Sequence, residues 1–494
     1  MNILQIMSDQ HMADAMGVAG HAQAITPNLD RLAASGMRCT RAYTNNPVCT
    51  PTRVSVLSGR YCHNHGYFAL GGPVPSDDLP DFLSHLGGHG YHTAAVGKLH
   101  LPRDPHHWLA NRVDYHAECC NDTLPENPYV QWARSQGLGD QIDFGSIPEL
   151  PGKQQNEARP SKLTYKQCVE GYTNQLAMQF IDGCEGEPWA MQVSYFRPHQ
   201  CYTPPKQFWD LYDDNLDLPF GWKDYDTSGR TPDFTEFVER WRDRPGMIEP
   251  TDPESRFRRV WRGYLACISM VDHAVGELLD HLQVRGLADH TAVMYHSDHG
   301  AYSGMYGLPE KAPGIASDQV CRIPMIWRVP GVTKPGQTTD AFVEQVDIAP
   351  TFAALAGAEP MPDPDGFDLT PILRGEDRPF RDCAVTENLW SKAVRWDNWR
   401  FVHYHRMMYD GQDHGELYDL DADPLETNNL YHDPAFRETR EEGRRRILEW
   451  LTHSTRVVTQ FNPLPPRPGE DWPQGIDRAE IASWQGGVGK VRYT

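Results

Sequence analysis

The chain lacks the sequence features of a membrane protein and of a disulfide-stapled secreted protein. No apolar run reaches the roughly 18 residues that a membrane span needs, and the first apolar segment, residues 3–7, has no charged leader or cleavage site before it. The 11 cysteines are odd in number and form no CxxC pair. We therefore expect a soluble cytoplasmic protein, with a leader lost from the given sequence as the alternative.

Basic residues are also scarce. Lys and Arg total 46 against 67 Asp and Glu, a formal charge of −21, and no block of basic residues interrupts the acidity. This argues against nucleic acid and anionic membranes as partners. At roughly 150 residues per domain, 494 residues suggest about three domain-equivalents, or one large domain with an appendage.

Short apolar segments alternate with helical patterns along most of the chain. The segments 3–7, 93–96, 190–196, 291–295 and 323–329 have the length of buried strands. Helical spacing with capping residues occurs over 26–36 and 79–88, and the clearest helix covers about 256–284. This order predicts an α/β fold with a mainly parallel sheet.

The composition changes after residue 357. A Pro- and Asp-rich linker, 359–366, precedes two strand-like segments, 393–404 and 416–420, and a charged helix over 433–453. The last residues are proline-rich and contain Trp472 and Trp484, which favours an extended arm. We predict a catalytic domain over 1–370, a small subdomain over 371–454 and an arm over 455–494 that packs on a second copy of the chain.

Candidate metal ligands follow two of the predicted strands. Asp9 and Gln10 come after the first strand, and Asp298 and His299 come after the strand that ends at 295. Open α/β sheets bind ligands at the carboxyl ends of their strands. Carboxylate and imidazole groups are common metal ligands. A structural or capping role for Asp298 and His299 is the alternative.

The segment 47–59 combines a cysteine with the start of a helix. Thr50 is a candidate N-cap and Pro51 a candidate first helical residue, which would place Cys49 beside the helix N-terminus with Arg53 in the first turn. Free amides, the helix dipole and a guanidinium form a site for a tetrahedral oxyanion. Spacing alone leaves open that Cys49 is one more buried cysteine.

Two motifs resemble the signatures of the type I sulfatases of the alkaline phosphatase superfamily. The first is Cys49-Thr50-Pro51-Thr52-Arg53 with Gly59 downstream, and the second runs from Gly90 to His100. Similar segments follow in family order at 195–199, 297–300, 347–351 and 417–421, with Lys311 beyond the second of them. The resemblance implies an alkaline-phosphatase-like sheet sandwiched by helices, with a small C-terminal α+β subdomain.

The resemblance also implies a modified cysteine and a metal ion. A maturation enzyme would oxidise Cys49 to formylglycine (3-oxoalanine), whose hydrated aldehyde is the nucleophile. The residues implied to hold one divalent cation are Asp9, Gln10, Cys49, Asp298 and His299. Gln10 and His299 replace the Asp and Asn of many sulfatases and look like the choline-sulfatase and phosphonate monoester hydrolase branch. Ca²⁺ is favoured, with Mn²⁺ or Mg²⁺ as alternatives.

The remaining roles carried by the resemblance concern charge and proton transfer. Arg53, Lys98 and Lys311 would surround the sulfate group, His199 with Lys311 would protonate the leaving oxygen, and His100 would act as the base. The implied reaction is hydrolysis of a carbohydrate or small alkyl or aryl sulfate monoester through a formylglycine–sulfate intermediate. The alternatives are a phosphonate monoester or phosphodiester hydrolase, and a non-catalytic binder of sulfated ligands if Cys49 is not converted.

Substrate specificity is not readable from the motifs. Two long segments, 101–165 and 200–255, are rich in aromatic residues that either line a substrate pocket or pack within the loops. These aromatic residues include Trp108, Tyr129, Trp132, Tyr202, Trp209 and Trp222.

Overall fold

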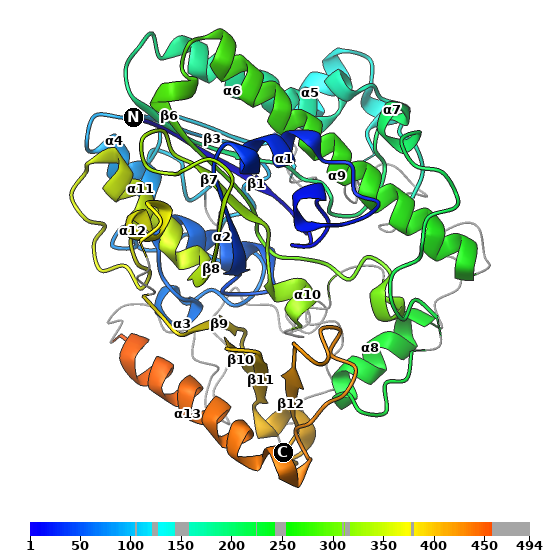
Figure 1. Cartoon of the computed structure of the whole chain (residues 1–494). Coiled ribbons are helices and arrows are strands. Elements are labelled where there is room, and N and C mark those ends of the chain that lie inside the picture. Colours follow the sequence, from blue (N-terminus) through cyan, green and yellow to red (C-terminus); the bar gives the residue numbers. More distant parts are fainter. Residues whose placement is uncertain are drawn as a thin grey trace.

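The structure is a computed structural model of the chain (Figure 1). It describes residues 1–103, 106–120, 127–143, 158–223, 225–242, 253–308, 311, 317–376 and 380–456. Residues 457–494, most of the predicted arm, lie outside this part, so the arm and its role in an oligomer stay predictions. Within the described ranges, no helix combines the length and apolarity that crossing a membrane requires.

An eight-stranded sheet forms the centre of the molecule, with strand order β4-β3-β5-β1-β6-β7-β2-β8. Only β7 among these strands runs antiparallel to its neighbours, so the predicted mainly parallel α/β sheet is confirmed. The strands are β1 (Asn2–Ser8), β2 (Met37–Tyr43), β3 (His92–Gly97), β4 (Tyr115–Glu118), β5 (Trp189–Ser194), β6 (Thr291–Ser297), β7 (Met325–Arg328) and β8 (Gln337–Glu344).

Helices cover both faces of this sheet. One face packs against α1 (Pro27–Ala34), α6 (Val169–Gly183) and α9 (Pro253–Val284), and the other against α2 (Cys49–Ser58), α4 (Phe82–Gly87) and α11 (Ile348–Ala356). In β1, Leu4 and Ile6 join the first of these cores and Ile3 joins the second. A strand buried on both faces reads as a nearly continuous apolar run, as the sequence of β1 does apart from Gln5.

The longest helix, α9, follows the spacing in the sequence. Its predicted apolar stripe, from Val260 to Leu282 at intervals of three and four residues, is buried throughout. The shorter helices are α3 (Cys62–His65), α5 (Pro128–Ser135), α7 (Lys206–Trp209), α8 (Pro232–Arg242), α10 (Asp318–Cys321) and α12 (Thr370–Leu373).

A second, smaller sheet forms the C-terminal subdomain at the bottom of Figure 1. It is antiparallel, with order β12-β11-β10-β9, and the last helix, α13 (Arg437–Ser454), packs on β10 and β11. Its strands are β9 (Cys383–Glu387), β10 (Ser391–Trp396), β11 (Trp399–Tyr404) and β12 (Gly415–Asp419).

The expectation of one strand-like segment over 393–404 is wrong, because this segment is a hairpin of β10 and β11. Trp396 pairs with Trp399, and Asp397 takes a positive φ of 41° in the two-residue turn between them. Asp and Asn tolerate this left-handed conformation. The apolar pattern continues on both sides of the Asp397-Asn398 turn, which hid the reversal in the sequence.

Candidate active site

The pairing of β1 with β6 brings together the metal-ligand candidates that are nearly 300 residues apart in the chain. The two strands are parallel neighbours, and Ser8 lies opposite Ser297 at their carboxyl ends. Asp9 and Asp298 are the next residues of each strand, so they leave the sheet side by side. The predicted convergence at this edge is therefore observed.

Cys49 reaches the same edge from the start of α2. The helix begins at Cys49 with Val48 as its N-cap, so the prediction that Thr50 caps it is wrong. The Thr50 hydroxyl is engaged elsewhere, because it donates to the carbonyl of His100 at 2.8 Å. The helix ends at Ser58 and is capped by Gly59, whose φ of 68° favours glycine. Cys49 thus lies in the first turn, where the backbone N–H groups point outward.

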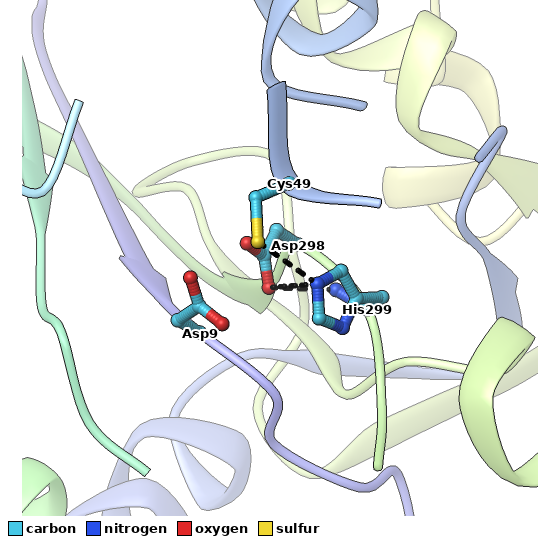
Figure 2. A group of neighbouring side chains, drawn as sticks. All are labelled: Asp9, Cys49, Asp298 and His299. Carbon is cyan, nitrogen blue, oxygen red and sulfur yellow. Dashed lines mark hydrogen bonds and ion pairs between the residues drawn. The ribbon is translucent and has the colours of Figure 1, made fainter. Parts of the chain in front are cut away.

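Four side chains from these elements face one another (Figure 2). One ligand atom from each of Asp9, Cys49, Asp298 and His299 lies within 4.8 Å of all the others, and all four residues are buried. Nδ1 of His299 lies 2.9 Å from the Gly300 carbonyl, and Nε2 lies 3.3 Å from Cys49 Sγ. A proton on Nδ1 that donates to this carbonyl leaves the lone pair of Nε2 directed into the cluster.

Gln10 completes this group of donors. It takes a positive φ of 67°, and its backbone N–H donates to Asp298 Oδ1 at 3.1 Å. Both polar atoms of its buried side chain, and Oδ1 of Asp9, have no hydrogen-bond partner among the described residues. Buried polar atoms left without partners are costly and require a bound group or water. The donor set of carboxylates, an amide oxygen and an imidazole fits a divalent cation.

Two cations hold the carboxylates in place. The Arg53 guanidinium contacts Asp9 Oδ2 at 3.1 Å and Asp298 Oδ2 at 2.8 Å, and it also bonds Ser194 and the carbonyl of Lys98. Lys98 Nζ lies 2.5 Å from Asp9 Oδ2. Arg53 therefore braces the ligand carboxylates in this structure, and its predicted contact with sulfate oxygens stays a prediction.

These charges shift the two carboxyl groups in opposite directions. Burial raises the pKa of Asp298, and the negative charge of Asp9 raises it further. Burial raises the pKa of Asp9 too. The nearby cations outweigh burial, Lys98 most of all, and hold the pKa of this carboxyl well below its usual value. A bound cation would relieve the repulsion between the two buried acids.

The surroundings of Cys49 stabilise negative charge at that position. Lys311 Nζ donates to Cys49 Sγ at 3.5 Å. Burial and Asp9 raise the pKa of the thiol, yet Lys311, Lys98 and His299 together bring it well below its ordinary value. Sγ stands where the oxygen of a converted residue would stand, so the same cations would favour an oxyanion there.

The two candidate proton-transfer histidines differ in how they are held. His199 Nδ1 lies 2.6 Å from the carbonyl of Gln200. Burial and then Lys98 lower the pKa of His199 well below its usual value. His100 is part-exposed and has a φ of 50°; its backbone N–H donates to Glu118 Oε2 at 2.5 Å. No described residue partners His100 Nδ1.

Three supporting residues escaped the sequence analysis. Gln345 donates to the carbonyls of Ser297 and Asp298 at 2.8 and 2.9 Å and accepts from the Thr52 hydroxyl. Ser194 accepts from Arg53 at 2.9 Å. Glu118 also accepts from the N–H of Leu99 at 3.2 Å. All three are polar residues at or beside strand ends, and only the fold shows which such residues reach the site.

Most of the aromatic candidates for a substrate pocket are buried. Among the six residues named for the long segments, Trp108, Tyr129, Tyr202 and Trp209 are buried. Trp132 and Trp222 are part-buried, and Trp132 lies 4.9 Å, ring to ring, from Tyr172. We therefore do not assign substrate contacts to this group.

Comparisons with known proteins agree with this arrangement. The Sulfatase family model matches residues 1–358, and a model described as N-sulphoglucosamine sulphohydrolase, C-terminal, matches residues 314–452. The chain is similar to a choline-sulfatase of Rhizobium meliloti, at 29% identity over 88% of this chain and 83% of the relative.

Two solved structures share the fold. One is a phosphonate monoester hydrolase from Silicibacter pomeroyi, with a TM-score of 0.79 and 22% identity over 92% of this chain and 95% of the other. The second is a protein in complex with its substrate D-glucosamine-2-N,6-O-disulfate, with a TM-score of 0.72 and 22% identity over 92% and 98% of the two chains. Because the family model covers well over half of the sequence and the site follows its motifs, the chain belongs to the sulfatase family, the hydrolases that act on sulfate esters.

Proposed function

We propose that this protein hydrolyses a sulfate monoester to an alcohol and inorganic sulfate at the site around Cys49. The observation that carries the proposal is the position of Cys49. It lies in the first turn of α2, beside His299 and Lys311, at the edge where Asp9 and Asp298 emerge. A tetrahedral anion bound there meets a helix N-terminus and cationic side chains.

A divalent cation fits the donors at this edge. The ligands would be Asp9, Gln10, Asp298, His299 and the residue at position 49, four of which already have donor atoms within 4.8 Å of one another. When bound, the cation supplies Lewis-acid polarisation of sulfate oxygens and lowers the pKa of the nucleophile. Ca²⁺ suits the two carboxylates and the amide oxygen, while the imidazole of His299 keeps Mn²⁺ and Mg²⁺ as alternatives.

Position 49 also fits conversion of the cysteine to formylglycine by a maturation enzyme. A hydrated aldehyde supplies a gem-diol nucleophile, and a second hydroxyl allows sulfate to leave without a further attack on sulfur. Lys311 and Lys98 already favour negative charge at the side chain of residue 49. The protein's contribution is thus a preorganised positive environment around that atom.

The remaining side chains divide the proton and charge transfers among them. Lys98 and Lys311 would hold the sulfate oxygens, and Lys311 would also assist His199 at the leaving oxygen. Arg53 would add to the positive field from behind the carboxylates. With its Nδ1 hydrogen-bonded to a carbonyl, His199 has Nε2 for a proton aimed at the leaving oxygen. The low pKa of His199 rises when an anionic sulfate binds beside it. His100 would remove the hydroxyl proton at position 49 to complete turnover.

The substrate class that we propose is a carbohydrate sulfate or a small alkyl or aryl sulfate. Named relatives span this range, from the choline-sulfatase to an N-acetylglucosamine-6-O-sulfatase of Bacteroides thetaiotaomicron. A phosphonate or phosphate-diester hydrolase is the second candidate, because a phosphonate monoester hydrolase shares the fold and a tetrahedral anion of similar size fits the same site.

A kinetic comparison distinguishes these two candidates. We expect kcat/KM for p-nitrophenyl sulfate to exceed that for a phenylphosphonate ester of the same leaving group. A phosphonate preference of orders of magnitude would show that sulfate is not the substrate. A panel of sulfated sugars and choline sulfate would then order the substrate classes.

Mass analysis and metal binding test the site without turnover. The peptide containing residue 49 should have the mass of an aldehyde in place of a thiol, and an unconverted thiol in the native host would favour a non-catalytic binder of sulfated ligands. Ca²⁺, Mn²⁺ and Mg²⁺ should each be added to the chelated protein. A ligand at 100 times its Kd stabilises the fold by about 2.7 kcal/mol. The Asp298→Asn variant should lose this stabilisation by the added cation.

Two further expectations remain proposals. We propose a cytoplasmic location and a homo-oligomer formed through the arm at 455–494. Truncation after Ser454 should reduce the oligomer's mass class in solution, and an unchanged mass class would contradict the role of the arm.

A further inference from the structure

Lys311 reaches the active site from a stretch of chain whose described flanks both contact the C-terminal subdomain. Tyr306 precedes Lys311 by five residues, and Asp318 follows it by seven. Tyr306 bonds to Leu425, and Asp318 bonds to the adjacent residue, Glu426. These two residues lie beyond β12, in a turn at 423–428 that we call the anchor turn.

The first contact holds Tyr306, five residues before Lys311. The hydroxyl of Tyr306 donates to the carbonyl of Leu425 at 2.6 Å, and its backbone N–H donates to the carbonyl of Phe220 at 3.0 Å. The ring is buried among other aromatic rings, 4.8 Å from Tyr225 and 5.6 Å from Tyr302. Tyr306 is therefore held by packing as well as by the hydrogen bond to the anchor turn.

The second contact holds Asp318, seven residues after Lys311. The backbone N–H of Asp318, the first residue of α10, donates to Glu426 Oε1 at 3.1 Å. Arg400 of β11 pairs with the same oxygen at 2.9 Å, and Arg230 donates to the carbonyl of Glu426 at 2.6 Å. Glu426 is fully buried. A buried carboxylate shared between an arginine and a backbone N–H has little freedom to move.

The anchor turn is rigid through its own hydrogen bonds. The carbonyl of Asp423 accepts from the N–H of Glu426 at 3.1 Å. Its carboxylate accepts from the Thr427 hydroxyl at 2.9 Å and from the N–H of Asn428 at 2.8 Å. A side chain that satisfies neighbouring backbone groups in this way stabilises a turn locally.

We propose that the anchor turn positions Lys311 in the active site, and that Glu426 and Leu425 are positioning residues for the reaction. Lys311 Nζ lies 3.5 Å from Cys49 Sγ, and a long lysine side chain holds such a geometry only if its backbone is fixed. The C-terminal subdomain thus contributes to catalysis through Lys311. The chemical role of Lys311 rests on the proposed function, whereas the anchoring of its chain does not.

Limited proteolysis tests the anchoring without metal, modification or substrate. Trypsin cleaves after Lys311 only when that residue leaves its buried position. We expect Tyr306→Phe, which removes only the donor hydroxyl, and Glu426→Ala to be cleaved at this bond faster than the wild type. Glu426→Gln keeps an oxygen that accepts from Asp318 and should restore protection.

The matched control is Tyr409→Phe. The Tyr409 hydroxyl donates to Asp233 of α8, so this variant also removes a hydrogen bond between the C-terminal subdomain and the catalytic domain. It leaves both contacts of the anchor turn intact and should be cleaved at Lys311 no faster than the wild type. Global weakening of the subdomain interface would instead expose Lys311 in both tyrosine variants.

Kinetics on two leaving groups test the catalytic consequence. Displacing a group that acts on the leaving oxygen should slow an alkyl sulfate more than p-nitrophenyl sulfate, by up to about 10²-fold for a displacement of an ångström. A lower fraction of folded enzyme would slow both substrates equally. If Tyr306→Phe leaves cleavage at Lys311 unchanged, or raises it without changing the ratio of the two substrates, the positioning role is wrong. A wild-type protein that hydrolyses no sulfate ester would overturn the proposed function, while the proteolysis result would still decide the anchoring.

Discussion

Two of the buried charge clusters in the described part of the chain are built on opposite plans. At the ends of β1 and β6, Asp9 and Asp298 converge with a cysteine and a histidine, and Asp9 Oδ1 has no partner within the described chain. At the junction with the C-terminal subdomain, Glu426 Oε1 is shared by Arg400 and a backbone N–H.

The difference separates binding from positioning. Buried acids that face one another are costly and gain from a cation brought from outside the chain. Buried acids matched to arginines on another element hold two parts of the chain together. In our proposals the first cluster binds metal and substrate, and the second transmits the position of the C-terminal subdomain to Lys311.

The largest expected effect lies at the centre of the first cluster. Cys49→Ala removes the residue to be converted and should lower kcat/KM by about 10⁴-fold or more, as loss of a nucleophile does. Cys39→Ala is the control, because burial raises the pKa of the Cys39 thiol to about 12 and it lies in β2. Assays with p-nitrophenyl sulfate measure both, and a Cys49→Ala variant with near wild-type activity would refute the assignment.

The next effect is a pH dependence of stability that belongs to the second cluster. Burial raises the pKa of Glu426 from 4.5 to about 7, against the opposing effect of Arg400 and Arg230. The folded state then holds this proton more tightly than the unfolded chain, so the stabilisation is complete below pH 4.5 and is lost as the pH rises through 7. Over this pH range the free energy of unfolding should fall by up to about 3 kcal/mol on account of Glu426, and Glu426→Gln should remove this fall.

Denaturant unfolding at several pH values between 4.5 and 7.5 measures this slope. Glu277→Gln is the control, because it should leave the slope in this pH range unchanged. Burial raises the pKa of Glu277, but hydrogen bonds from Lys166, Tyr165 and Asn174 bring it below its usual value. Its stabilisation is present above the unfolded pKa and is lost on acidification. Equal slopes in wild type and Glu426→Gln would contradict the prediction for Glu426.

A smaller effect is expected from the residue that braces the first cluster. Arg53→Lys keeps the charge but loses the fork that spans Asp9 and Asp298. The affinity for the divalent cation should fall by about 10- to 100-fold, as it does when residues that orient metal ligands are replaced. Calorimetric metal titration measures this.

Arg112→Lys provides the matched comparison for Arg53→Lys. Arg112 pairs with Asp81 at 2.9 Å, next to α4 and outside the metal-ligand group. This variant should bind the cation as the wild type does. An unchanged cation affinity in Arg53→Lys would mean that the carboxylates are oriented without the guanidinium.

Local sequence patterns predicted much of the fold, and the resemblance to the sulfatases identified the clustered site residues. The stripe of α9 and the apolar run of β1 were readable because each pattern reports burial of its own element. The hairpin of β10 and β11 was missed because two strands with the same alternation flank a turn of only two residues. The predicted start of α2 was wrong because Thr50 was taken as its N-cap, whereas the Thr50 hydroxyl bonds outside the helix.

The supporting residues, and the contacts that each charged residue makes, were harder to predict from the sequence. Arg53 is a cation in a motif, but only the tertiary structure shows that it bonds the carboxylates of Asp9 and Asp298. Gln345 carries no pattern that separates it from other glutamines, although it fixes the carbonyls of Ser297 and Asp298. Four of the aromatic residues of the long segments proved to be buried. Burial of a loop residue depends on contacts with distant segments, which a local pattern does not contain.

The sequence by itself determined the alternating elements and the chemical identity of the site residues, because spacing and residue type are local properties. The tertiary structure decided how those residues are used. Strand order places Asp9 beside Asp298, and packing of the C-terminal subdomain ties both flanks of Lys311 to Leu425 and Glu426. Contacts between residues more than a hundred positions apart arise only when the chain folds, since loop closure and packing bring them together.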